Sequence, residues 1–129
     1  DVLLSVTCGE GFGVPIIEAQ ACGTPVIVGE WTSMGELCLA GRVVPTRGGA
    51  DRWWTPLEAY QFRPRSGPIC NALNWAYKCA REDKVRERAR LGAMDYDADA
   101  VAEKYWKPTL EDIKRKIDAL GVQYQAVTK

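Results

Sequence analysis

The residues best suited to chemistry lie in one glycine-rich stretch near the start of the chain, which reads CGEGFGVPIIEA from Cys8 to Ala19. An apolar run from Val2 to Thr7 precedes it, and residues with helical content follow from Val14 to Cys22. This order predicts a turn between the carboxyl end of a strand and the amino end of a helix, where open α/β sheets bind ligands. The N–H groups and dipole of such a helix favour an anion, and glycines let a diphosphate approach the backbone. The stretch therefore predicts a phosphate-binding turn.

Two carboxylates frame this turn: Glu10 lies within it, and Glu18 lies about one turn into the predicted helix. Helical side chains tilt toward the amino end of their helix, so we expect both carboxylates to face one crevice. A carboxylate repels a phosphate, but it accepts two O–H groups at once, as the diol of a ribose or of a sugar offers. The predicted ligand is thus a phosphate with sugars on both sides, which describes a nucleotide sugar.

The same turn allows other interpretations. Gly9, Gly11 and Gly13 alone would be no more than turn residues. A dinucleotide site would place its ribose-binding acid at Glu30, but its fingerprint needs a glycine where Val14 stands. A glycosidase pair needs two carboxyl groups at a set separation, which sequence cannot establish. A P-loop is excluded, because no Gly-Lys-Ser/Thr follows.

The composition excludes several classes of protein. The chain has 129 residues, no histidine, and 17 basic residues balanced by 17 acidic ones. Without histidine, this chain alone cannot form a Ser-His or Cys-His nucleophile pair or a His-ligated zinc site. Balanced charge gives no global attraction to nucleic acid, and no apolar run approaches the roughly 20 residues of a membrane span. We expect a cytoplasmic protein with reduced thiols, no nucleic-acid partner and no integral membrane segment.

One acidic cluster, Asp95-Tyr96-Asp97-Ala98-Asp99, suggests a metal at first sight. A calcium loop would need glycine at Ala100 and glutamate at Trp106. A metal-binding DxD should close a strand, whereas this cluster lies between predicted helices, where aspartates commonly cap a helix start. We therefore predict no metal site and no cofactor.

The spacing of the two glutamates also carries a family resemblance. Glu10 and Glu18, embedded in EGFGVPIIEAQACGTPVIV, resemble the E-x7-E signature of retaining glycosyltransferases of the GT-B fold, family four, also called glycosyl transferases group 1. The resemblance covers residues 1–45, about a third of the chain. It implies a hexosyltransferase of glycan biosynthesis that uses a nucleotide diphosphate sugar, transfers the sugar with retention of configuration and needs no metal.

The resemblance assigns roles to individual residues. Glu18 would hold the nucleotide ribose, and Glu10 would lie near the hydroxyls of the donor sugar; these two are the expected catalytic pair. Ser33-Met34-Gly35-Glu36 matches the short helix that lies beside the donor in that family. The residues expected to contact the donor are Gly11, Phe12, Gly13, Val14, Glu18 and Glu36.

The resemblance also implies missing parts. The family has earlier strands, an upstream basic pair and an N-terminal acceptor lobe, which would be the part that places the protein at a membrane surface. We expect this chain to be part of a donor lobe that is inactive alone; turnover by the isolated chain would contradict this. The alternatives are an NAD-dependent Rossmann oxidoreductase domain and a degenerate, non-catalytic lobe that serves as an interaction module.

The expected fold class is α/β: a partial Rossmann-like parallel sheet of about three strands from a GT-B C-terminal lobe, followed by a helical tail. Residues 1–129 should form a single partial domain. Within it, residues 1–45 should form a βαβ core that binds the nucleotide sugar, with strands at Val26 to Gly29 and Arg42 to Pro45 and a short helix from Thr32 to Leu39. Residues 46–67 should be an irregular loop rich in arginines and aromatic residues, whose role the sequence leaves open.

Residues 68–129 should be helical. Four helices are expected, over residues 68–81, 84–91 and 99–106 and from Thr109 onward. The last should begin with a capping box of Thr109 and Asp112 and end at Gly121, with the apolar stripe Leu110, Ile113, Ile117 and Leu120 on one face. The alternating charges from Arg81 to Arg90 are typical of a solvated helix face.

Overall fold

A computed structural model describes residues 1–120 of the chain, which divides into two units, Asp1–Met94 and Asp95–Lys129. The first unit contains a parallel sheet in the order β1-β2-β3, formed by Leu3–Ser5, Val26–Gly29 and Gly41–Val44. Helix α1 (Val14–Ala21) connects β1 to β2. The predicted three-stranded βαβ core is confirmed, and β2 has the predicted bounds.

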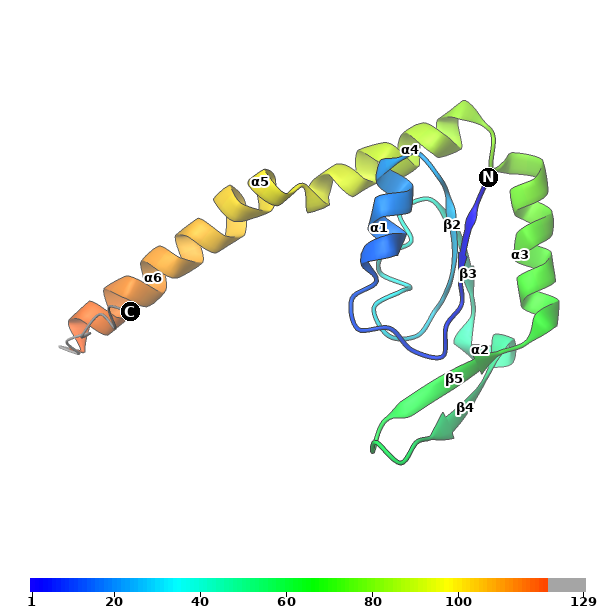
Figure 1. The fold of residues 1–129 in the computed structure, drawn as a ribbon, viewed down its shortest axis with the longest axis horizontal. Helices are drawn as coiled ribbons and strands as arrows, with labels where there is room; N and C mark the ends of the chain where they lie inside the picture. The colour runs from blue at the N-terminus through cyan, green and yellow to red at the C-terminus, as the bar shows by residue number, and fades with distance from the viewer. Residues whose placement is uncertain (121–129) are drawn as a thin grey trace, which may run out of the picture. The chain divides into compact units, whose positions relative to one another are not determined.

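The sheet of the first unit lies between helices. Figure 1 shows α1 on one side of the strands and α3 (Ser66–Cys79) on the other, and α4 (Asp83–Ala93) packs against α1. Because helices cover both faces of its middle strand, Val26, Ile27 and Val28 are completely buried. The continuous apolar run of β2 is therefore the centre of the core.

A buried glutamine joins α1 to the chain that enters β3. The Gln20 Nε2 group donates to the carbonyl oxygens of Ile16 and Leu37, at 3.0 and 2.8 Å. Its Oε1 atom accepts the N–H groups of Leu39 and Ala40, each at 2.9 Å. The Gln20 side chain is fully buried, so these four hydrogen bonds satisfy polar atoms of its own that water cannot reach.

The predicted helix from Thr32 to Leu39 is wrong. The structure has a series of turns there, with a bond from the Leu37 N–H to the Ser33 carbonyl and another from the Cys38 N–H to the Gly35 carbonyl. Thr32 adopts a left-handed φ of 57°, which is incompatible with a right-handed helix starting at this residue.

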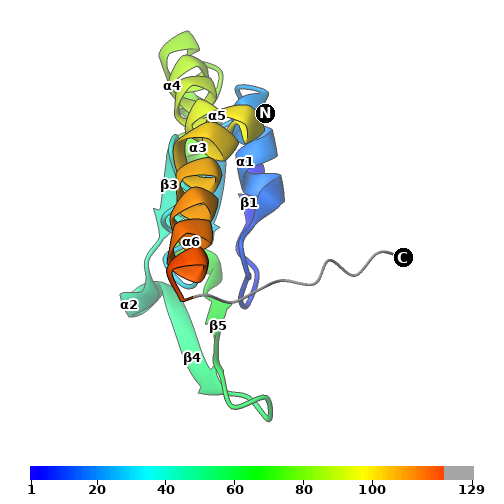
Figure 2. The same ribbon diagram turned by 90° about the vertical axis from the view of Figure 1, so that its left-hand side faces the viewer.

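The prediction of an irregular loop over residues 46–67 is also wrong. A short turn labelled α2 (Thr46–Gly49) leads into an antiparallel hairpin of β4 (Ala50–Trp54) and β5 (Tyr60–Pro64). A turn closed by two bonds from Thr55, through its N–H and its hydroxyl, to the Ala59 carbonyl joins the strands. In both views the hairpin extends from the edge of the sheet where α2 lies (Figures 1 and 2).

The helical region after residue 68 is confirmed as far as residue 120, with different bounds. The described elements from residue 94 on are η1 (Met94–Tyr96), α5 (Ala98–Val101), a π-helical turn η2 (Ala102–Trp106) and α6 (Lys107–Ala119). Asp97 caps α5 by accepting the Ala100 N–H at 3.0 Å. The capping box is wrong, because Thr109 lies inside α6 and Asp112 instead pairs with Arg115 and Lys116. Gly121 lies outside the described residues.

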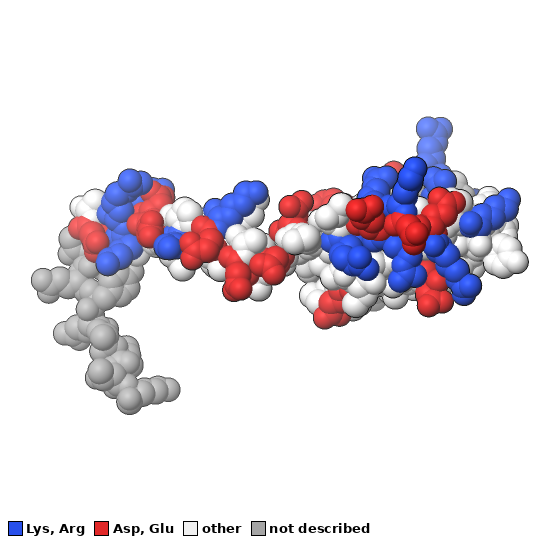
Figure 3. Space-filling view, turned by 90° about the horizontal axis from the view of Figure 1, so that it is seen from above, with Lys and Arg blue, Asp and Glu red and all other residues white. Residues whose placement is uncertain are grey.

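The surface of α4 carries the predicted alternation of charge. Figure 3 views the molecule from above, so the side of the first unit that faces the reader is the top of Figure 1, where α4 lies. Basic and acidic side chains are interspersed on this side. None of the helices formed by residues 1–120 has the length and apolar character needed to cross a bilayer.

Candidate functional site

The glycine-rich stretch lies where the sequence places it, between β1 and α1. All three strands are parallel, so the chain leaves each of them at the same edge of the sheet. The loop of residues 8–13 follows β1 at this edge, the turns of residues 30–40 follow β2, and α2 with the hairpin follows β3. The carboxyl edge therefore gathers three segments that are distant in the sequence.

Three consecutive residues after β2 hold this loop by hydrogen bonds. The Trp31 indole N–H donates to the Thr7 carbonyl at 2.8 Å. The Glu10 N–H donates to the Thr32 hydroxyl oxygen at 3.2 Å. The Ser33 hydroxyl donates to the Phe12 carbonyl at 2.7 Å. The neighbouring turns thus hold the loop just before its start, in its middle and near its end.

Gly13 makes the turn into α1. It has a φ of 98° and precedes the helix as its N-cap residue. A Cβ atom there would lie 3.0 Å from Ile16 Cδ1 and 3.2 Å from Leu37 Cδ1. Both the backbone conformation and the packing therefore favour glycine at this position.

The first turn of α1 presents few backbone donors. A helix leaves its first N–H groups without partners inside the helix, but Pro15 has no N–H and the Ile16 N–H donates to the Gly13 carbonyl at 2.9 Å. The N–H groups of Gly13 and Val14 also have no acceptor within α1, because the residues four positions before them lie outside the helix. These two N–H groups lie at the positive end of the helix dipole, which favours an anion.

The two predicted carboxylates differ in their surroundings. Glu10 is half-buried, and its Oε1 atom accepts the Gly11 N–H at 2.9 Å. Its Cγ atom lies 3.4 Å from where a Gly13 Cβ would stand, so the side chain folds over the loop. Glu18 is exposed on α1, one turn beyond the loop, and Glu36 is exposed in the turns after β2.

Glu30, the acid that a dinucleotide site would use, takes part in the fold. Its Oε2 atom accepts the Thr46 N–H at 2.7 Å, which ties the end of β2 to the start of α2. This hydrogen bond uses one of the two carboxylate oxygens that would otherwise receive a ribose diol.

The hairpin also reaches the loop. The Phe62 N–H donates to the Cys8 carbonyl at 2.9 Å. The Phe62 ring stacks on Trp31 with their centroids 5.5 Å apart. Through these two contacts the middle of β5 lies beside the beginning of the loop, just two residues before Glu10.

The residues that hold the loop were not predicted from sequence. Trp31, Thr32 and Ser33 follow the buried strand β2 after one intervening residue, at the edge where the loop must lie, and this position was the available signal. Phe62 had no comparable signal, because its contact with Cys8 depends on the hairpin that the sequence did not predict.

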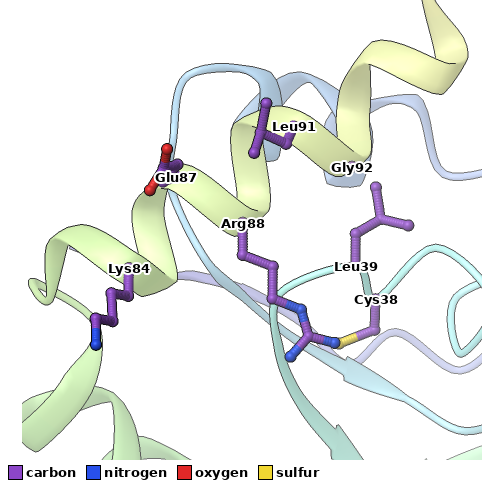
Figure 4. A pocket seen from close by; sticks show the side chains of 7 residues that line it. All are labelled: Cys38, Leu39, Lys84, Glu87, Arg88, Leu91 and Gly92. Atoms are coloured by element: carbon purple, nitrogen blue, oxygen red, sulfur yellow. The ribbon is translucent and has the colours of Figure 1, made fainter.

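A separate hollow of about 590 Å³ lies on another part of the first unit, between α4 and the residues that precede β3. Figure 4 shows the side chains of Lys84 and Arg88 on α4 and that of Cys38 across the hollow. Burial raises the pKa of the Cys38 thiol, and the positive charges of Arg88 and Arg42 oppose this shift only in part.

This shift leads to a prediction about thiol reactivity. Because the thiolate is the reactive form, Cys38 should be alkylated several-fold more slowly than the exposed Cys22 near pH 8, and the difference should narrow at higher pH. Iodoacetamide labelling followed by peptide mass spectrometry measures both rates in one sample. Equal rates for Cys38 and Cys22 would contradict this expectation.

Within the described part of the chain, no three acidic or cysteine side chains lie close enough together to hold a metal ion. Comparisons with models of protein families, with curated proteins and with solved structures give no match to this chain.

Proposed function

We propose that the loop of residues 8–13 and the start of α1 bind a nucleotide diphosphate sugar, and that the intact protein is a retaining hexosyltransferase of the GT-B type. The observation that carries this proposal is the loop itself. It lies at the carboxyl edge of a parallel sheet and is held by three hydrogen bonds from neighbouring turns. Glu10 lies in this loop before the N-terminus of α1, and Glu18 lies on α1 beyond it.

The diphosphate would bind at the N-terminus of α1. The N–H groups of Gly13 and Val14 would donate to its oxygens, and the glycines of the loop permit close approach. During transfer the diphosphate leaves and gains negative charge, which N–H groups already held in place stabilise without reorganisation. The hydrogen bonds from Trp31, Thr32 and Ser33 would maintain this arrangement.

The two glutamates would bind sugar hydroxyls on opposite sides of the diphosphate. Glu18, which is exposed on α1, would accept the ribose diol. Glu10, folded over the loop, would lie near the transferred sugar, whose anomeric carbon would gain positive charge in an oxocarbenium-like transition state. The N-terminal lobe that the family resemblance implies would supply most of the acceptor site.

The alternative of an NAD site has less support. Its ribose would depend on Glu30, which already accepts the Thr46 N–H, and Val14 stands where the third glycine of the fingerprint belongs. An interaction module without nucleotide affinity remains the other alternative, and the same experiment distinguishes it.

Thermal unfolding with a ligand panel tests the proposal. The panel contains UDP, GDP, ADP, their sugar conjugates and NAD. One nucleoside diphosphate and its conjugates should raise the midpoint by several degrees, since a ligand at a hundredfold excess over its Kd stabilises by about 2.7 kcal/mol. Glu18→Ala should remove most of this rise.

Glu111→Ala is the matched control, because Glu111 is also an exposed glutamate on a helix but lies on α6. It should leave the shift unchanged. A shift with NAD alone, or an equal loss in both variants, would contradict the proposal. If no nucleotide raised the midpoint of thermal unfolding, the result would favour the interaction module.

A further inference from the structure

One face of the hairpin carries a cluster of aromatic rings around an arginine. The strand register places Trp54 opposite Tyr60 and Arg52 opposite Phe62, so these four side chains share a face. The Trp54 and Tyr60 rings meet edge to face with centroids 4.8 Å apart, and the Arg52 guanidinium lies 4.2 Å from the Tyr60 centroid. We call these three residues, Arg52, Trp54 and Tyr60, the aromatic face.

This face is continuous with the candidate site. Phe62, on the same side of the hairpin, stacks on Trp31, and its N–H donates to the Cys8 carbonyl. Cys8 lies two residues before Glu10 in the sequence. Phe62 therefore connects the aromatic face to the part of the loop that precedes Glu10, near which the transferred sugar is expected.

The aromatic face is open to solvent and carries a single charge. Trp54 and Tyr60 are 56% and 51% exposed. Of the six residues that β4 and β5 place on this side, Arg52 is the only charged one. An exposed indole suits the apolar C–H face of a pyranose ring, and a guanidinium suits a carboxylate or phosphate group beside it.

We propose that the aromatic face binds an acidic sugar, with its ring stacked on Trp54 and its carboxylate or phosphate on Arg52. The role of this sugar as the acceptor rests on the proposed function, because only a donor at Glu10 makes the neighbouring surface an acceptor site. Binding of the sugar itself depends on the hairpin alone.

The opposite face of the hairpin supplies matched controls. There the Arg63 guanidinium lies 5.5 Å from the Trp53 centroid, and the register pairs Trp53 with Gln61. Trp54 and Arg52 thus each have a residue of the same type on the opposite face of the hairpin. Trp54→Ala is compared with Trp53→Ala, and Arg52→Ala with Arg63→Ala.

The test is an NMR titration of the 129-residue chain without nucleotide, following the tryptophan indole N–H signals. The probes are methyl glucopyranoside, its uronate analogue methyl glucuronoside, and glucose 6-phosphate. The two acidic probes should shift the Trp54 signal and bind about tenfold more tightly than the neutral one. Trp54→Ala should weaken all binding at least about tenfold, and Arg52→Ala should remove the preference for acidic probes.

Several results would overturn the proposal. The first is that no probe shifts the Trp54 indole signal. The second is that neutral and acidic probes bind with equal affinity. The third is that Trp53→Ala and Arg63→Ala weaken binding as much as Trp54→Ala and Arg52→Ala do. Circular dichroism of each variant confirms folding, and Trp54→Phe should retain most binding if Trp54→Ala fails to fold. If nucleotides bind but acidic sugars do not, this proposal fails alone; if acidic sugars bind but nucleotides do not, the proposed function fails and the carbohydrate site stands.

Discussion

Replacing Gly41 with alanine should prevent the sheet from forming as it does in this structure. A Cβ atom at this position would lie 1.8 Å from the backbone oxygen of Val26, in the buried central strand. Because strand backbones rather than a flexible side chain would have to move apart, we expect the free energy of unfolding to fall by at least about 3 kcal/mol. Urea unfolding measured by circular dichroism gives this change directly.

Gly67→Ala is the control for this experiment. Gly67 lies in the first turn of α3, and an added Cβ would meet no atom within 4 Å. Alanine should be neutral there or slightly stabilising, since it loses less backbone entropy than glycine in a helix. If Gly41→Ala unfolded within 0.5 kcal/mol of the wild-type value, the position of β3 against β2 would be incorrect.

The second large effect is expected for Gln20→Leu. Leucine has a similar size, but it cannot accept the N–H groups of Leu39 and Ala40 or donate to the Leu37 carbonyl. Each buried polar group left without a partner costs about 1–3 kcal/mol, so a total loss on the order of 3–5 kcal/mol should follow. The same urea experiment measures it.

Gln61→Leu provides the matched control on the hairpin. Gln61 is only half-buried, and it lies on the side away from the aromatic face. Its replacement should change the free energy of unfolding by less than about 0.5 kcal/mol. If both glutamine variants were equally stable, the hydrogen bonds of Gln20 would contribute little to the fold.

The parts of the fold that depend on short stretches of sequence were predictable. The apolar run of β2, bounded by Pro25 and Glu30, predicted its strand with the correct ends. The glycines and Pro15 predicted where α1 begins, because a left-handed turn followed by a proline in the first helical turn is a local pattern. The position of Glu10 and Glu18 around that turn follows from the same pattern.

The parts that depend on distant contacts were not predictable. In the hairpin, Arg52, Trp53 and Trp54 are all large and amphipathic, so they show no alternation of apolar and polar residues that would indicate a strand. The turns after β2 contain residues with helical propensity, but Thr32 is held in a left-handed conformation while its hydroxyl bonds to the loop. A lone glutamine such as Gln20 gives no sign of which backbone groups it will meet.

The hydrogen bond at the base of the hairpin allows this region to change in length. The Arg65 N–H donates to the Gly49 carbonyl at 2.8 Å. The residue that precedes the hairpin and the residue that follows it therefore lie side by side, just before α3 begins. The distance between β3 and α3 is therefore independent of the length of the segment between these two residues. Insertions and deletions within residues 50–64 should be accommodated without disturbing the parallel sheet, because the entropy of closing a loop changes only slowly with its length. The surface beside the loop of residues 8–13 can thus change in this segment while the parallel sheet stays the same.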